Sequence, residues 1–198
     1  MSHESVIAAL NALSKTRAYQ VEMQQHVEHL FAESDRVAII LSSSMVEHVM
    51  TAVLEARMPG LNSDEQARIF GLEGPLGTFA NKIRIGQGLG LFDRAMRKRF
   101  DIVRSMRNAA AHCVTPVTFE IPEFREGAIQ LFSPKARELF KDITAYGVRI
   151  AFSHSLTTMA QAIGTEEYEY DEHDTLRVIL ELIEFQEQLQ GSPETPEG

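Results

Sequence analysis

The chain has 198 residues, of which 44% are hydrophobic, with a formal net charge of −9, a pI of about 5.3 and one cysteine, Cys113. This length is sufficient for one domain with a hydrophobic core, and a single cysteine excludes an internal disulfide and is typical of a reducing compartment. The negative charge argues against direct DNA binding, because duplex affinity depends largely on cations that displace phosphate counterions. The amino terminus lacks the features of a secretory signal and no apolar run approaches membrane length, so we expect a cytoplasmic protein outside the membrane.

Charge is unevenly distributed along the chain. Residues 165–198 contain eleven acidic residues and one basic residue, Arg177, whereas residues 82–107 contain eight basic residues and two acidic ones. The eight basic residues are Lys82, Arg84, Arg94, Arg97, Lys98, Arg99, Arg104 and Arg107. This basic block ends at a short motif, "RNAAAH", at residues 107–112.

Most of the chain has the composition and apolar periodicity of helices. The first helical region is predicted at residues 5–31 and the second at residues 35–58, where apolar residues on most sides indicate a central position in the fold. Shorter helices should follow, and the helix after Asp93 should carry the motif. The predicted N-caps are Asp35, Ser63 (in a capping box with Gln66), Thr78, Asp93 and Ser133.

Residues 114–132 differ from the rest of the chain in composition. The runs "VTFEI" and "AIQLF" favour β-structure and are separated by "PEFREG", which predicts a small β-hairpin. A helix should then run from residue 134 to about residue 163, with Gly164 as its C′ residue, before an acidic helix at residues 174–190 and a disordered tail at residues 191–198. The predicted fold class is therefore all-α: one helical domain over residues 1–190 with roughly six to eight helices and a core at about residues 35–164.

The motif can be placed on its helix by turning about 100° per residue. The stripe expected to face the core consists of Phe100, Val103, Met106 and Ala110, and a polar ridge consists of Arg104, Asn108 and His112. Arg107 lies at the margin of the core stripe. An arginine there commonly pairs with a carboxylate, and a histidine at a helix end commonly meets the last carbonyls. Alternatively, Arg107 and His112 serve one shared functional groove.

The segment before the motif carries a resemblance to a known family. "EGPLGTFANKIRIGQGLGLF" at residues 73–92, followed some fifteen residues later by "RNAAAH", resembles the mannitol operon repressor (MtlR) family. In that family a "GPLG-S/T-F" turn leads into a helix with a basic residue and an "LGL" ending, and an "R-N-x-x-x-H"-like segment lies on the next helix. The resemblance covers about residues 35–164 and implies a transcription-related regulator that acts through protein–protein contacts.

The same motif is similar to the signature of the wider HEPN superfamily of small helical bundles, which usually dimerise. In catalytic members this signature is the site of a metal-independent ribonuclease, which implies roles for Arg107, Asn108 and His112 here. Glu47 resembles the acidic residue that many such proteins present from the preceding central helix. Lys82, Arg84 and Arg104 are the candidates for substrate binding.

The chemistry of RNA cleavage fits these residue types. A histidine can move protons near neutral pH, and an arginine can stabilise the charge of a phosphorane-like transition state. Asn108 could orient the imidazole or the phosphate, and Glu47 could hold the arginine. Two functions therefore stay open: the regulator, which we place first, and a metal-independent endoribonuclease as the alternative.

No cofactor is expected from the remaining motifs. His26 and His29 are three residues apart but have no third ligand nearby, and "GQGLGL" does not follow a strand as a dinucleotide-binding loop would. We therefore expect no metal and no organic cofactor. The first expected partner is a second copy of the chain in a two-fold homodimer, because the helix at residues 35–58 has more apolar surface than one bundle neighbour can cover and the family resemblance implies dimers. The second is an unidentified protein, with RNA as the partner in the alternative.

Overall fold

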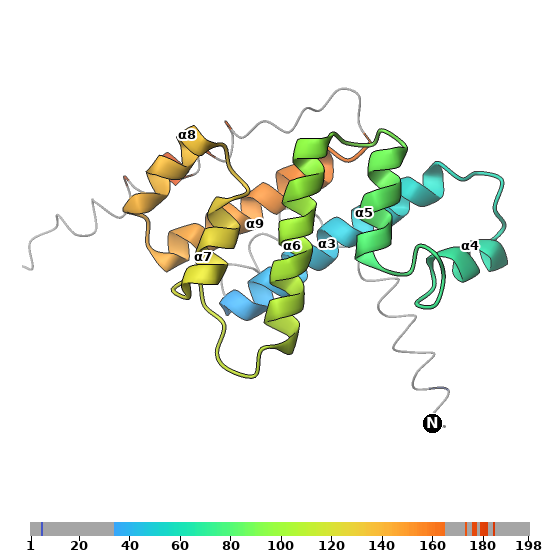
Figure 1. Ribbon diagram of the computed structural model, residues 1–198, viewed down its shortest axis with the longest axis horizontal. Coiled ribbons are helices and arrows are strands. Elements are labelled where there is room, and N and C mark those ends of the chain that lie inside the picture. Colours follow the sequence, from blue (N-terminus) through green and yellow to red (C-terminus); the bar gives the residue numbers. More distant parts are fainter. Residues whose placement is uncertain are drawn as a thin grey trace, which may run out of the picture.

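The computed structural model describes Ser5, residues 34–164 and, in the C-terminal segment, His173, Leu176, Arg177, Ile179, Leu180, Glu181 and Glu184. Residues 34–164 form helices without strands (Figure 1), which confirms the all-α prediction for this part of the chain. The predicted helical region at residues 5–31, with His26 and His29, lies outside the described residues apart from Ser5, as does most of the predicted acidic helix. The helices are α3 (Asp35–Ala56), α4 (Ser63–Phe70), α5 (Phe79–Gly88), α6 (Arg94–His112), α7 (Pro122–Ile129), α8 (Pro134–Arg137), the 3₁₀ helix η1 (Glu138–Lys141) and α9 (Ala145–Gln161).

Two layers of helices enclose the core (Figure 1). α3 and α9 pack against each other in one layer, and α5, α6 and α7 cross them in the other. α6 is central in its layer, because it contacts α3, α5 and α7. The apolar faces of both layers meet between them, as a helical domain requires.

α3 occupies the centre of the fold, as its apolar sequence predicts. Ile39, Val46, Met50 and Leu54 are completely buried. The expectation that no apolar segment reaches membrane length is wrong for this helix, since its 22 residues are long and apolar enough to cross a bilayer by length and composition. Its buried residues instead pack against α5, α6 and α9, which is the environment of a core helix.

The predicted helix caps are partly confirmed. Thr78, Asp93 and Ser133 accept hydrogen bonds from the first turns of α5, α6 and α8. Two predictions are wrong by one residue: Ser34 rather than Asp35 caps α3, and Asn62 with Glu65, rather than Ser63 with Gln66, forms the capping box of α4.

Asp35 is displaced from the cap by contacts with distant parts of the chain. Its carboxylate accepts a hydrogen bond from the Phe119 amide at 2.8 Å and lies 3.5 Å from the Arg149 guanidinium. Ser34, one residue earlier, is therefore the side chain that caps the helix.

The predicted β-hairpin at residues 114–132 is wrong, because none of these residues forms a strand and α7 covers the predicted turn and the start of the second predicted strand. Pro122 stands in the first turn, where a helix tolerates proline because the missing N–H has no intrahelical partner. Phe124 and Ala128, four residues apart, are buried against the rest of the bundle. Burial of this face therefore overrides the β-prone composition.

The long helix predicted from residue 134 to about 163 is interrupted. α8 and η1 end before Asp142, and Thr144 caps α9 as a separate helix. The Arg125 guanidinium of α7 donates hydrogen bonds to the carbonyls of Phe140 and Ile143, each at 2.7 Å. These carbonyls are thus bonded outside a continuous helix. Gly164, predicted as the C′ residue, has a positive φ of 73° but lies two residues after the C-cap Ala162, one position later than predicted.

Candidate functional site

α6 carries the motif and is fixed at both ends. Asp93 accepts a hydrogen bond from the Met96 amide at 2.7 Å, and the predicted core stripe of Phe100, Val103, Met106 and Ala110 is buried. At the other end, the Arg36 guanidinium donates to the carbonyls of Ala110, Cys113 and Thr115. The last turn of α6 is therefore held by α3 through a residue that sequence reasoning missed, since an arginine near a helix start gives no signal of a distant contact.

An ionic cluster joins three of the predicted site residues. Glu47 of α3 lies between α5 and α6, with one carboxylate oxygen 2.9 Å from Lys82 Nζ and the other bonded to the Arg107 guanidinium. The exposed fraction of the side chain is 15% for Glu47, 8% for Lys82 and 32% for Arg107. The structure thus brings together Glu47, Lys82 and Arg107, which we call the Glu47 cluster.

The Glu47 cluster contains two cations for one carboxylate. A buried charge is tolerated only when it is paired and hydrogen-bonded. Glu47 accepts a hydrogen bond from Lys82 with one carboxylate oxygen and from Arg107 with the other. Each of the three helices α3, α5 and α6 contributes one of these side chains, so the cluster also links the two layers.

The other predicted site residues are not part of the Glu47 cluster. Asn108 and His112 are exposed on α6, and within the described part of the chain their side chains make no hydrogen bond or ion pair. Arg84 is exposed and lies 3.4 Å from the Asn81 side chain, while Arg104 lies 3.8 Å from Asp101. The roles of these four residues in an active site stay predictions.

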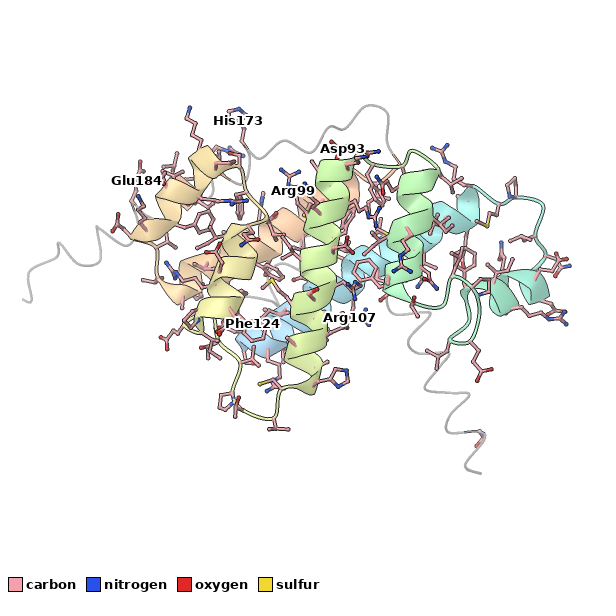
Figure 2. All side chains as sticks on the ribbon, viewed as in Figure 1. Asp93, Arg99, Arg107, Phe124, His173 and Glu184 are labelled. Carbon is pink, nitrogen blue, oxygen red and sulfur yellow. The ribbon has the colours of Figure 1, made fainter. Side chains whose placement is uncertain are left out.

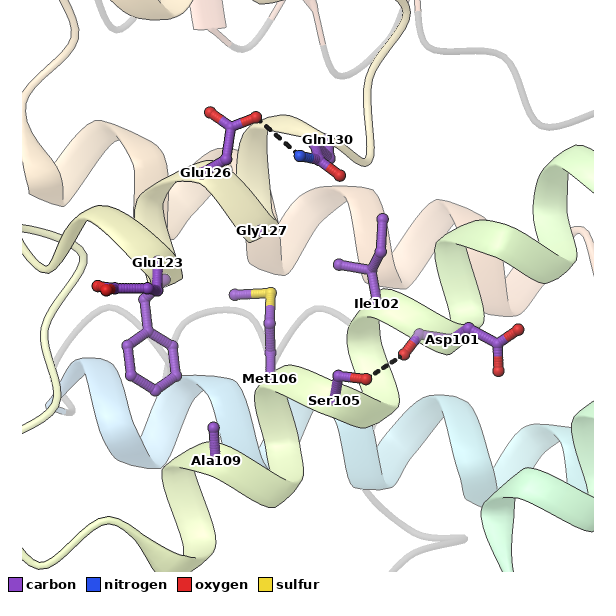
Figure 3. A pocket seen from close by; sticks show the side chains of 10 residues that line it. Asp101, Ile102, Ser105, Met106, Ala109, Glu123, Glu126, Gly127 and Gln130 are labelled. Atoms are coloured by element: carbon purple, nitrogen blue, oxygen red, sulfur yellow. Dashed lines mark hydrogen bonds between the residues drawn. The ribbon is translucent and has the colours of Figure 1, made fainter.

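A groove lies on the other side of α6, where α7 packs. Figure 2 shows Arg107 and Phe124 on opposite sides of this helix. The groove is open to solvent, has a volume of about 580 Å³ and is mostly apolar. Its lining residues are Asp101, Ile102, Ser105, Met106, Ala109, Glu123, Phe124, Glu126, Gly127 and Gln130 (Figure 3). We call it the α6–α7 groove.

Its floor depends on a close approach of the two helices. Met106 lies between α6 and α7 (Figure 3), and a Cβ atom at Gly127 would be only 2.9 Å from Met106 Sδ. Glycine at residue 127 therefore allows the methionine to fill the floor. Ala109, one turn away, is exposed and leaves one end of the floor uncovered.

Three carboxylates surround the apolar floor of the α6–α7 groove. Asp101 on α6 has oxygens 3.7 Å from Arg97 and 3.8 Å from Arg104, so its charge is partly compensated. On α7, Glu126 accepts a hydrogen bond from the neutral Gln130 amide at 2.8 Å. Glu123 is exposed, and within the described residues its carboxylate pairs with no cation. Among the residues that the structure describes, neither glutamate on the α7 side therefore pairs with a cation.

Sequence reasoning missed this groove. "PEFREG" was expected in a turn between strands, so its glutamates had no predicted partner surface. Because α7 is a helix, Glu123 and Glu126, which are three residues apart, lie on the same side of it. If the segment had been assigned as a helix, this spacing would have indicated an acidic side.

Comparisons with protein-family models, with curated proteins and with solved structures find no match to this chain. Within the described residues, no group of three metal-ligating side chains is close enough to hold a metal ion.

Proposed function

We propose that the chain is a regulatory protein that acts by binding another protein. The observation that supports this proposal is the α6–α7 groove, which combines an apolar floor, an open side and charged residues at its edges. An enclosed small-molecule site would bury most of its ligand and present convergent polar groups, whereas an open apolar groove between helices suits a protein segment.

The Glu47 cluster is consistent with this proposal. Glu47 engages Lys82 and Arg107 within one chain, so both cations have a structural partner. The transcription-related role and the cytoplasmic location rest on the sequence: the MtlR resemblance, the acidic charge that disfavours direct DNA binding, and the single cysteine.

Photo-crosslinking in cells tests the proposal directly. A photo-reactive residue replaces Ser105, which is exposed and lines the groove, and the matched control replaces Ala111, which is exposed on α6 away from it. We expect a discrete protein adduct from residue 105 that disappears when Ala109→Gln fills the groove. Equal adducts from both positions, or none, would contradict a protein partner in this groove.

A metal-independent endoribonuclease is the second candidate, and one observation favours it. Arg107 keeps 32% of its side chain exposed while Glu47 holds its guanidinium, and the exposed His112 follows on the same helix. An oriented guanidinium and an imidazole on the same helix could stabilise charge and transfer protons during RNA cleavage.

The second candidate has its own assay. Purified protein is incubated with mixed RNA in EDTA, beside Arg107→Ala and His112→Ala. Cleavage that leaves 2′,3′-cyclic phosphate ends and is lost in both variants would establish the enzyme. If the wild type is inactive and His112→Ala is folded, the ribonuclease candidate is abandoned.

A further inference from the structure

We propose that the occupant of the α6–α7 groove is an amphipathic helix with two apolar side chains on neighbouring turns and with lysine or arginine on the side that faces α7. This inference rests on the proposed function, since it names the chemistry of the protein partner.

The length of the floor sets the size of the apolar contact. Ile102, Met106 and Ala109 follow each other along one side of α6 and span about 10 Å at 1.5 Å per residue. The eight residues of α7 run for about 12 Å on the same scale. Such a floor accommodates about two turns of a helix, so it can receive the side chains at positions i and i+4 or i and i+3.

The shape of the groove favours a helix over an extended strand. Its two walls are helices, and a third helix can place a ridge of side chains into the groove between them. An added strand would instead need a free sheet edge, and residues 34–164 contain no sheet. Ala109 provides the open end where the larger apolar side chain of the partner can enter.

The charges determine the orientation of the partner. Glu123 and Glu126 have no cation within the described residues, whereas Asp101 already lies near Arg97 and Arg104. Added positive charge is therefore stabilised more on the α7 side than on the α6 side. Complementary charges of this kind raise the association rate and fix the register more than they raise affinity.

A displayed library of helix-forming peptides tests the inference. Two positions one turn apart are apolar, the remaining surface positions are randomised, and selection on the wild type is followed by counter-selection on Ala109→Gln. Ala111→Gln is the matched control, because it makes the same change at an exposed position of α6 outside the groove.

We expect enriched peptides with a net positive charge on one side of the apolar pair. Their affinity should fall about tenfold with Ala109→Gln, because a filled groove excludes one anchoring side chain. It should also fall with the double variant Glu123→Gln/Glu126→Gln. Ala111→Gln and Asp64→Asn/Glu73→Gln, which removes two exposed carboxylates elsewhere, should bind as the wild type does.

Three results would overturn the inference. Enriched peptides that are neutral or acidic would contradict the charge assignment. Equal binding to Ala109→Gln and Ala111→Gln would show that the groove is not the site. A dimer of the wild type that Ala109→Gln dissociates would assign the groove to a second copy. If any of these occurs while the photo-crosslink from residue 105 to another protein persists, the proposed function stands and only the chemistry of the occupant is wrong.

Discussion

Glu47 of α3 is bonded to a cation on α5 and to a cation on α6. It is the shared partner of Lys82, whose side chain is 8% exposed, and of Arg107, whose side chain is 32% exposed. Removing its charge leaves the buried Lys82 ammonium without a carboxylate from the described part of the chain, whereas removing Arg107 leaves the Glu47–Lys82 pair intact. The two substitutions should therefore have unequal effects on stability.

We expect Glu47→Gln to lower the free energy of unfolding by about 3 kcal/mol, the usual cost of breaking a buried ion pair. Arg107→Gln should cost about 1 kcal/mol, because its partner keeps a second cation and its own side chain is partly solvated. Urea unfolding of both variants measures the difference. Equal losses would show that Lys82 does not depend on Glu47.

Cys113 provides a second test at the residue scale. A hydrogen bond between its thiol and the Thr115 hydroxyl, with Sγ and Oγ1 3.1 Å apart, lowers the pKa of the Cys113 thiol. The thiolate then forms at a lower pH than in an ordinary cysteine, and alkylation by iodoacetamide depends on the thiolate. In Thr115→Val the pH midpoint of alkylation should move upward. An unchanged midpoint would mean that the hydroxyl does not stabilise the thiolate.

At the scale of elements, local signals predicted three of the five helix caps and placed the other two within one residue. Thr78, Asp93 and Ser133 cap their helices through bonds that span three residues, so residue type and position predict them. The segment at residues 114–132 was mispredicted because its helix is selected by burial of Phe124 and Ala128, which the local sequence does not show.

The break before α9 was missed because it also depends on contacts that are distant in the sequence. Substitution of Arg125 tests this explanation. Its guanidinium joins α7 to the carbonyls of Phe140 and Ile143, which are distant in the sequence. Arg125→Ala should lower the free energy of unfolding by about 1–3 kcal/mol, because two carbonyls lose a charged donor. Hydrogen exchange should also accelerate at residues 140–147. Lys135→Ala, at an exposed position of α8, is the control, and equal exchange in both variants would contradict this role.

At the scale of the whole molecule, sequence reasoning recovered the helical class, the central helix and the core face of α6. It also named the three members of the Glu47 cluster, because the resemblance pointed to Glu47 and Arg107 and the basic block pointed to Lys82. It could not find the α6–α7 groove, since that surface requires α7 to be a helix and Gly127 to lie against Met106.

The apolar surface of α3 leads to a prediction about assembly. Leu41 remains 41% exposed on this helix although its neighbours in the bundle cover most other apolar residues. We expect a two-fold homodimer in which a second copy covers such surface, weakened by Leu41→Lys. Sedimentation at micromolar concentration measures the mass of the protein in solution, and a monomeric wild type would contradict this prediction.

The central claim is that the protein acts through the α6–α7 groove, and complementation of a deletion strain tests it most directly. Transcript profiles are compared after restoring the wild type, Ala109→Gln, Ala111→Gln or His112→Ala at equal protein levels. The regulatory account predicts that the wild type, Ala111→Gln and His112→Ala restore the wild-type profile, whereas Ala109→Gln does not. Restoration by Ala109→Gln together with failure of His112→Ala would contradict it and assign the activity to the motif on α6.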